Sequence, residues 1–188
     1  MSKLEKKGQI SKEVKWMQIL LIRHGESEDD FLEEGYKGST DLQLTKRGLE
    51  QVEKMSSYIS KELSPELIWS STLLRATQST EILNNAVNCP VEYLIELRKM
   101  QNGESKLDFR LRAENILAVV RERSKQYKRI AIVSHGGVIT KIIDSFLQLP
   151  KEHDVWFHTD NTGIHLLEYQ SNFRIIRFSN NTNHLNIS

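Results

Sequence analysis

Short apolar runs alternate with helix-like patterns along most of the chain. Nearly continuous apolar runs over 16–22, 67–69, 91–95 and 130–134 are typical of strands buried on both faces of a sheet. Between these runs, apolar residues recur at helical spacing. This alternation predicts an α/β fold, a three-layer α/β/α sandwich with a mainly parallel sheet. Two later runs, near 164–169 and 174–178, are separated by so few residues that they predict an antiparallel pair.

Capping residues indicate where the predicted helices begin. Thr45 is expected to cap the first helix, and Pro65 lies just beyond its end. Ser70, Ser71 and Thr72 are alternative caps for a second helix that runs through Leu83. Ser105 and Asp108 fit the acidic variant of a capping box before a long third helix. The fourth helix is expected from Gly137 to about Leu147.

Length and charge favour a single domain of ordinary composition. The chain has 188 residues, of which 38% are hydrophobic and 27% charged, values that suit one globular domain. Residues 1–15 are rich in Lys and Glu and are expected to form an N-terminal extension, which leaves 16–188 as the domain. A net charge of +1 gives no bulk electrostatic reason to expect nucleic acid or an anionic membrane as a partner.

The cysteine content and the apolar runs bear on the compartment. Cys89 is the single cysteine, which excludes an internal disulfide and suits a reducing compartment. The longest apolar run is too short to cross a bilayer, and no apolar signal core follows the N-terminal charges. We therefore expect a soluble, cytoplasmic protein; its oligomeric state is open.

Basic side chains follow three of the predicted strands. Arg23 and His24 come directly after the first strand, and His135 comes directly after the strand at 130–134. Arg75 lies in the opening turn of the second helix. Ligands bind beyond the carboxyl ends of strands in open α/β sheets, where helix N-termini also favour anions. Two arginines and two histidines meeting at this edge predict a phosphate pocket that needs no metal.

Six ordered blocks of the sequence resemble one known family. The first, Leu21-Ile22-Arg23-His24-Gly25-Glu26-Ser27, is similar to the signature of the histidine phosphatase superfamily in its phosphoglycerate mutase-like branch. The other blocks that resemble this family lie at 41–51, 71–81, 103–112, 133–138 and 181–185. The resemblance implies a phosphoglycerate mutase-like fold and a reaction that proceeds through a phosphohistidine.

The resemblance also implies a role for each matched side chain. His24 would be the nucleophile, and Arg23, Arg75 and His135 would hold the non-bridging phosphate oxygens. Ser27 would add a hydroxyl donor. His24 must be neutral to attack; Arg23, Arg75 and a protonated His135 should lower its pKa, and a backbone carbonyl should fix its tautomer. No cofactor or metal is implied, and the partner is a small phosphorylated substrate.

The acid that protonates the leaving alcohol is less well defined. The family usually supplies a glutamate from a loop after the third strand, but here Glu96 lies only seven residues before Gly103, so much of that loop is missing. Glu96 is the candidate, against the alternative of an exposed charge at a strand end. A register without gaps would place Lys99 there instead, which is no ordinary acid near neutral pH. Glu104 is another nearby carboxylate, although its motif suggests a structural role.

Asp30 is a second departure from the family pattern. The family often has asparagine at this spacing, whose amide donates to phosphate, whereas an ionised aspartate cannot donate. Asp30 either faces away from the site or discriminates against highly anionic substrates. The other histidines show no convincing metal spacing, and His184 in the final block is expected to be structural.

Three functions fit these observations. The leading hypothesis is a metal-independent phosphatase that hydrolyses a phosphomonoester through a phosphohistidine on His24. A phosphoglycerate mutase-like phosphotransferase has the same core, but mutases of this branch usually carry extra segments over the site. The third alternative is a phosphate-binding protein with little turnover, which the shortened loop motivates.

Overall fold

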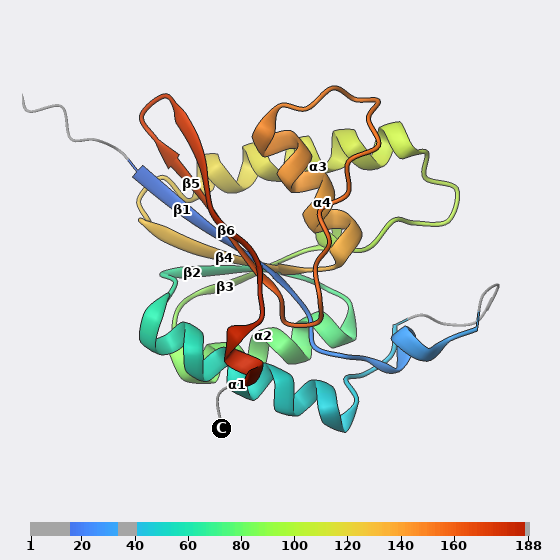
Figure 1. Cartoon of the computed structure of the whole chain (residues 1–188), viewed down its shortest axis with the longest axis vertical. Coiled ribbons are helices and arrows are strands. Elements are labelled where there is room, and N and C mark those ends of the chain that lie inside the picture. Colours follow the sequence, from blue (N-terminus) through green and yellow to red (C-terminus); the bar gives the residue numbers. More distant parts are fainter. Residues whose placement is uncertain (1–15, 34–40, 187–188) are drawn as a thin grey trace, which may run out of the picture.

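The computed structural model describes residues 16–33 and 41–186 (Figure 1). The predicted extension at 1–15 lies outside the described residues. The strands are β1 (Trp16–Arg23), β2 (Leu67–Ser71), β3 (Val91–Leu94), β4 (Arg129–Ser134), β5 (Ile164–Gln170) and β6 (Phe173–Asn181). The α-helices are α1 (Lys46–Glu62), α2 (Leu74–Val87), α3 (Lys106–Arg123) and α4 (Gly136–Leu147). Three 3₁₀ helices, which the sequence did not predict, are η1 (Glu28–Phe31), η2 (Ile95–Leu97) and η3 (Asn183–Asn186).

The strands form one sheet in the order β3-β2-β4-β1-β5-β6. The first four strands in this order are parallel, while β5 runs antiparallel to β1 and β6 antiparallel to β5. This arrangement confirms the mainly parallel sheet and the late antiparallel pair. Arg23 pairs with Ser134 at the end of the β1–β4 ladder. His24 and His135, the next residues, therefore emerge side by side at one edge of the sheet.

Helices cover both faces of the sheet, as predicted for three layers. Helices α1 and α2 lie on one face, and α3 and α4 on the other (Figure 1). Successive side chains of a strand point to opposite faces. Leu20 and Ile22 of β1 accordingly join the core beneath α1 and α2, while Ile19 and Leu21 join the core beneath α3 and α4. This two-sided burial explains the continuous apolar run.

Two of the three predicted helix caps are confirmed. Thr45 accepts the Gly48 N–H before α1, and Ser105 accepts the Asp108 N–H before α3. The predicted side-chain caps of α2 are wrong, because the N-cap residue is Leu73. Ser70 and Ser71 belong to β2, and the Leu74 N–H is satisfied from a distant segment instead, by Asp41 Oδ1 at 2.5 Å.

The sequence predicts apolar runs that are too short to cross a bilayer. No helix in the described part of the chain combines the length and the apolar character needed to cross a bilayer.

Candidate active site

His24 is held by the backbone at the end of β1. Its Nδ1–H donates to the Gly25 carbonyl at 2.7 Å, because a carbonyl can only accept. The other ring nitrogen, Nε2, therefore carries the lone pair, and it accepts the Arg75 Nε–H at 3.1 Å. The ring is buried, with 3% of the residue exposed. The predicted tautomer, fixed by a backbone carbonyl, is the one that this geometry requires.

Gly25 lets the segment after β1 pass close to α1. A Cβ at this position would lie 2.6 Å from the Gly48 carbonyl oxygen and 2.7 Å from Val52 Cγ2. A Cβ on Gly48 would in turn lie 1.9 Å from the Glu26 carbonyl oxygen. Two glycines are therefore needed where the chain turns beside His24, and the His24 ring contacts Arg75.

The second histidine lies against the first. The His24 and His135 ring centroids are 5.1 Å apart, with the ring planes inclined by 58°. His135 is the N-cap residue of α4, which begins at Gly136, one residue earlier than predicted. Its Nε2 is hydrogen-bonded to Ser71 Oγ at 2.9 Å, so the last residue of β2 orients the ring. The predicted meeting of His24, Arg75 and His135 is present in the structure.

Burial and positive charge keep His24 neutral. Burial is the largest effect, followed by the charge of Arg75 and, more weakly, that of Arg23. Together these effects lower the pKa of His24 from 6.5 to about 3, although the hydrogen bond to Gly25 and the charge of Asp30 oppose them. His24 is therefore unprotonated at neutral pH, as predicted.

His135 is neutral as well, which corrects one expectation. Burial, then the neighbouring His24 and the cations Arg75, Lys99 and Arg23, lower the pKa of His135 well below its usual range. The expectation of a protonated His135 is wrong for the free protein, because a buried ring surrounded by three cations does not gain a fourth charge.

Asp30 faces the site rather than away from it. Its Oδ1 accepts from Arg23 Nη2 at 2.9 Å, and its Oδ2 accepts from the Ser27 N–H at 3.0 Å and from Asn161 Nδ2 at 3.2 Å. Burial opposes ionisation, but the Ser27 N–H, the Arg23 charge and the other donors outweigh it and lower the pKa of Asp30. Asp30 is therefore an anion that fixes Arg23.

Ser27 does not take its predicted place. Its side chain is fully buried and lies outside the pocket lining, with its hydroxyl 3.4 Å from Asp30 Oδ2. The backbone of η1 turns immediately after Ser27, which directs the hydroxyl toward the start of this short helix. Ser27 is therefore not among the residues that line the pocket, and its predicted phosphate contact stays a prediction.

His24, His135 and their charged neighbours line a pocket of about 320 Å³. Its walls are formed by ten residues: Arg23, His24, Asp29, Asp30, Arg75, Lys99, His135, Gly136, Gly137 and Trp156. The sequence does not predict Asp29, Lys99 and Trp156 as site residues. For Lys99, the one signal in the sequence is the alignment without gaps, which places it where the family has its glutamate. For Asp29, the sequence indicates only a polar loop.

Glu96 lies outside this pocket. It is an exposed residue of η2, and its contact with Arg112 is made by the backbone carbonyl rather than the carboxylate. Glu104 is held by Arg112, with its two carboxylate oxygens each 2.7 Å from a guanidinium nitrogen, and this pairing lowers the pKa of Glu104. Glu104 is thus structural, as expected, and the shortened loop brings Lys99 rather than Glu96 to the pocket.

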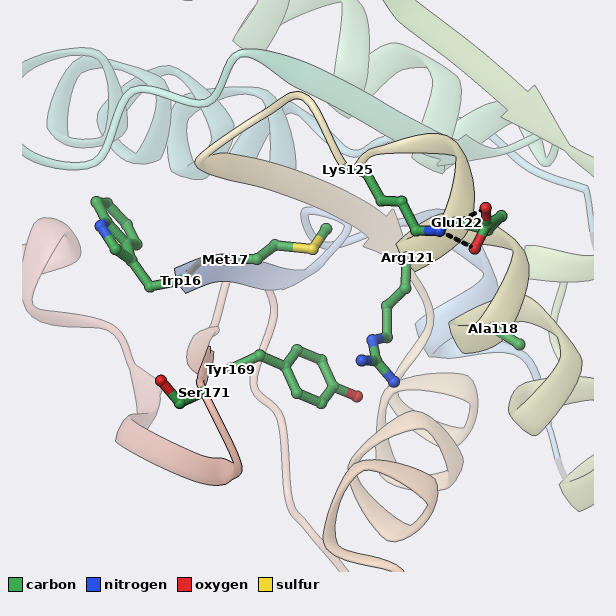
Figure 2. A pocket seen from close by; sticks show the side chains of 8 residues that line it. All are labelled: Trp16, Met17, Ala118, Arg121, Glu122, Lys125, Tyr169 and Ser171. Atoms are coloured by element: carbon green, nitrogen blue, oxygen red, sulfur yellow. Dashed lines mark hydrogen bonds and ion pairs between the residues drawn. The ribbon is translucent and has the colours of Figure 1, made fainter. Parts of the chain in front are cut away.

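A second, larger pocket lies at the other end of the sheet (Figure 2). It has a volume of about 460 Å³ and lies between the start of β1 and the second half of α3. Its polar groups are already engaged, since Arg121 stacks 3.9 Å from the Tyr169 ring centroid and Lys125 pairs with Glu122. Trp16 begins β1 and His24 follows its end, so roughly 25 Å of strand separate this pocket from the histidines.

The remaining histidines are not among the residues that line the pocket. His184 is buried, and its Nε2 is hydrogen-bonded to Thr162 Oγ1 at 3.0 Å, which confirms its structural role. His158 is an exposed partner of Asp160. Within the described ranges, no group of three or more His, Cys, Asp or Glu residues is arranged to hold a metal ion.

Comparison with known families agrees with this geometry. Residues 19–104 and 98–182 match the model of the histidine phosphatase superfamily (branch 1). The chain belongs to this superfamily. The two histidines and two arginines found together in the pocket all lie within the matched segments of this histidine phosphatase.

Individual relatives agree in fold and length. The adenosylcobalamin/alpha-ribazole phosphatase of Escherichia coli is 25% identical over 87% of this chain and 96% of its own. The alpha-ribazole phosphatase structure from Shigella flexneri superposes with a TM-score of 0.75 at 25% identity, covering 88% of this chain and 97% of that one. A phosphoserine phosphatase variant from Entamoeba histolytica in complex with phosphoserine shares the fold, with a TM-score of 0.76 at 21% identity over 90% and 99% of the two chains.

Proposed function

We propose that this histidine phosphatase hydrolyses a small phosphomonoester through a phosphohistidine on His24 Nε2. The observation that carries the proposal is the state of His24: a buried, neutral ring whose Nδ1–H is fixed by Gly25 and whose Nε2 lone pair faces Arg75. A neutral imidazole with its lone pair directed into an anion pocket is an activated nucleophile.

In the first step, Arg23, Arg75 and His135 hold the non-bridging oxygens of the substrate. The His24 Nε2 lone pair forms a bond to phosphorus while the bond from phosphorus to the ester oxygen breaks in line. Water then attacks the phosphohistidine and releases inorganic phosphate. The proposal retains His24, Arg23, Arg75 and His135 as catalytic residues, and it omits Ser27 and Glu96 because neither lines the pocket.

A matched pair of substitutions tests the nucleophile. His24→Ala should abolish release of phosphate from 4-nitrophenyl phosphate in the presence of EDTA. His158→Ala, which removes an exposed histidine outside the pocket, should retain the wild-type rate. Quenching into alkali during turnover should trap a phosphohistidine in the wild-type protein and none in His24→Ala. Turnover that persists in His24→Ala would refute the proposal.

Competition between hydrolysis and transfer tests the reaction type. We expect release of phosphate to exceed isomerisation of phosphoglycerate measured with a bisphosphoglycerate primer. Faster isomerisation would favour the mutase alternative, and tight phosphate binding without phosphohistidine formation would favour a binding protein. A substrate panel should include α-ribazole phosphate and phosphoserine, because two of the relatives are named for acting on these compounds.

We also propose that the reaction takes place in the cytoplasm. The half-buried Cys89 is a free thiol, which suits a reducing compartment. Fractionation of cells that express the protein from its own gene tests this location.

A further inference from the structure

Phosphate-ester cleavage leaves an alkoxide that must gain a proton, and the pocket offers few groups to supply it. Among the described residues that line the pocket, the carboxylates are Asp29 and Asp30. Both belong to η1, the short helix after β1. The choice of acid therefore depends on how each of these two carboxylates is held.

Asp30 is committed to another task. It accepts hydrogen bonds from Arg23, Asn161 and the Ser27 N–H, all of which stabilise its anionic form. Both oxygens of Asp30 are thus occupied by hydrogen bonds. Its contacts make it a support for Arg23.

Asp29 is held in a different way. Its Oδ1 accepts the Leu42 N–H at 3.1 Å, while its Oδ2 lies 3.2 Å from Arg75 Nη1 and 3.6 Å from Lys99 Nζ. Oδ2 is buried and, among the described residues, receives no hydrogen bond of good geometry. One oxygen of Asp29 thus anchors the side chain, and the other is buried between two cations at the wall of the pocket.

Asp29 is also close to the nucleophile. The Arg75 guanidinium contacts His24 Nε2 through Nε and Asp29 Oδ2 through Nη1. A single planar group therefore separates the attacking nitrogen from the carboxylate oxygen. A phosphoryl group bound by Arg75 would lie next to the guanidinium that contacts both atoms.

We propose that Asp29 is the general acid and base of the phosphatase reaction, an assignment that rests on the proposed function. When the ester bond breaks, its electron pair passes to the leaving oxygen, which takes the proton from the Asp29 carboxyl group. The Asp29 carboxylate then accepts a proton from the water that attacks the phosphohistidine, which restores the carboxyl group that served as the acid. Lys99 is a positioning residue that holds Oδ2 in place.

Substrate binding itself prepares Asp29 for this role. Phosphate oxygens compete with Oδ2 for Arg75, so the bound substrate replaces one of the two cations beside the carboxylate. The substrate also brings its own negative charge next to Asp29.

A series of substrates with different leaving groups tests the assignment. Protonation matters most for poor leaving groups, so Asp29→Asn should reduce kcat/KM by about 100-fold or more for an alkyl phosphate and by less than about 5-fold for 2,4-dinitrophenyl phosphate. Because the second step also loses its base, phosphohistidine should accumulate in Asp29→Asn during turnover of the dinitrophenyl ester. Asp29→Glu, which retains a carboxyl group, should regain part of the alkyl phosphatase activity.

The matched control is Glu28→Gln. Glu28 precedes Asp29 in the same helix, accepts from Gln43 Nε2 and lies outside the pocket lining, so all substrates should be hydrolysed at the wild-type rate. An equal loss by Asp29→Asn for every leaving group would overturn the assignment and indicate that Asp29 acts only through Arg75. No loss for the alkyl phosphate would also overturn it. Absence of phosphohistidine in the wild-type protein would instead refute the proposed function itself.

Discussion

Replacement of Arg75 by methionine should destabilise the protein by a predictable amount. Arg75 and Asp29 form an ion pair at 3.2 Å in which their side chains are only 3% and 9% exposed. Removing one member of a buried pair leaves an uncompensated charge and costs about 3–5 kcal/mol. Lys99 remains 3.6 Å from the same carboxylate oxygen, so we expect the lower end of that range.

The second substitution isolates the pair. Asp29→Asn removes the carboxylate charge that Arg75→Met leaves without its partner. The double variant should therefore be more stable than Arg75→Met alone by about 2 kcal/mol, which is within the usual range for coupled neighbours. The free energies of unfolding of the wild-type protein, both single variants and the double variant can be measured by urea denaturation with linear extrapolation. These four values form a double-mutant cycle whose coupling free energy reports on this contact.

A third substitution at this pair gives a kinetic readout. Arg75→Lys retains a positive charge but cannot contact both His24 Nε2 and Asp29 through one planar group, so kcat should fall about 10²–10³-fold, as for loss of a preorganised donor. Two results would refute the reasoning: a free energy of unfolding for Arg75→Met within about 0.5 kcal/mol of wild type, or an equal effect of Asp29→Asn in both backgrounds.

Three further predictions concern residues around the site and a distant buried histidine. Burial, followed by the charge of Lys54, lowers the pKa of His184 to about 4. Between pH 6.5 and 4 the unfolded chain therefore binds a proton that the folded protein does not, and stability is lost as the pH falls through that window. His184→Gln should reduce the slope of unfolding free energy against pH by about 1.4 kcal/mol per pH unit. Gly25→Ala should lower both activity and melting temperature, because the added Cβ would overlap the backbone of α1; an active variant of unchanged stability would show that the turn after β1 tolerates a side chain. Ser71→Ala should lower kcat with little change in melting temperature, since the hydroxyl orients His135, and an unchanged kcat would show that the ring needs no such support.

The sequence determined the layers of the fold and which basic side chains meet in the pocket. Apolar runs buried on both faces, such as 16–22 and 130–134, predict parallel strands, and parallel neighbours end at the same edge of a sheet. His24 and His135 follow such runs, so their meeting could be predicted before any coordinates were known. The blocks that resemble the histidine phosphatase superfamily placed Arg23 and Arg75 beside them, and the family match confirms that relationship.

Only the tertiary structure decided which carboxylates and hydroxyls face the pocket. The family resemblance predicts Glu96 as the acid, yet Glu96 is exposed, and Lys99 and Asp29 line the pocket instead. Ser27 turns to Asp30, and Asp41, far away in sequence, caps α2 where a local serine was expected. Periodicity reports whether a segment is buried, because burial is averaged over several residues. The direction of one polar side chain after a strand depends on donors and cations from remote segments, and these come together only when the chain has folded.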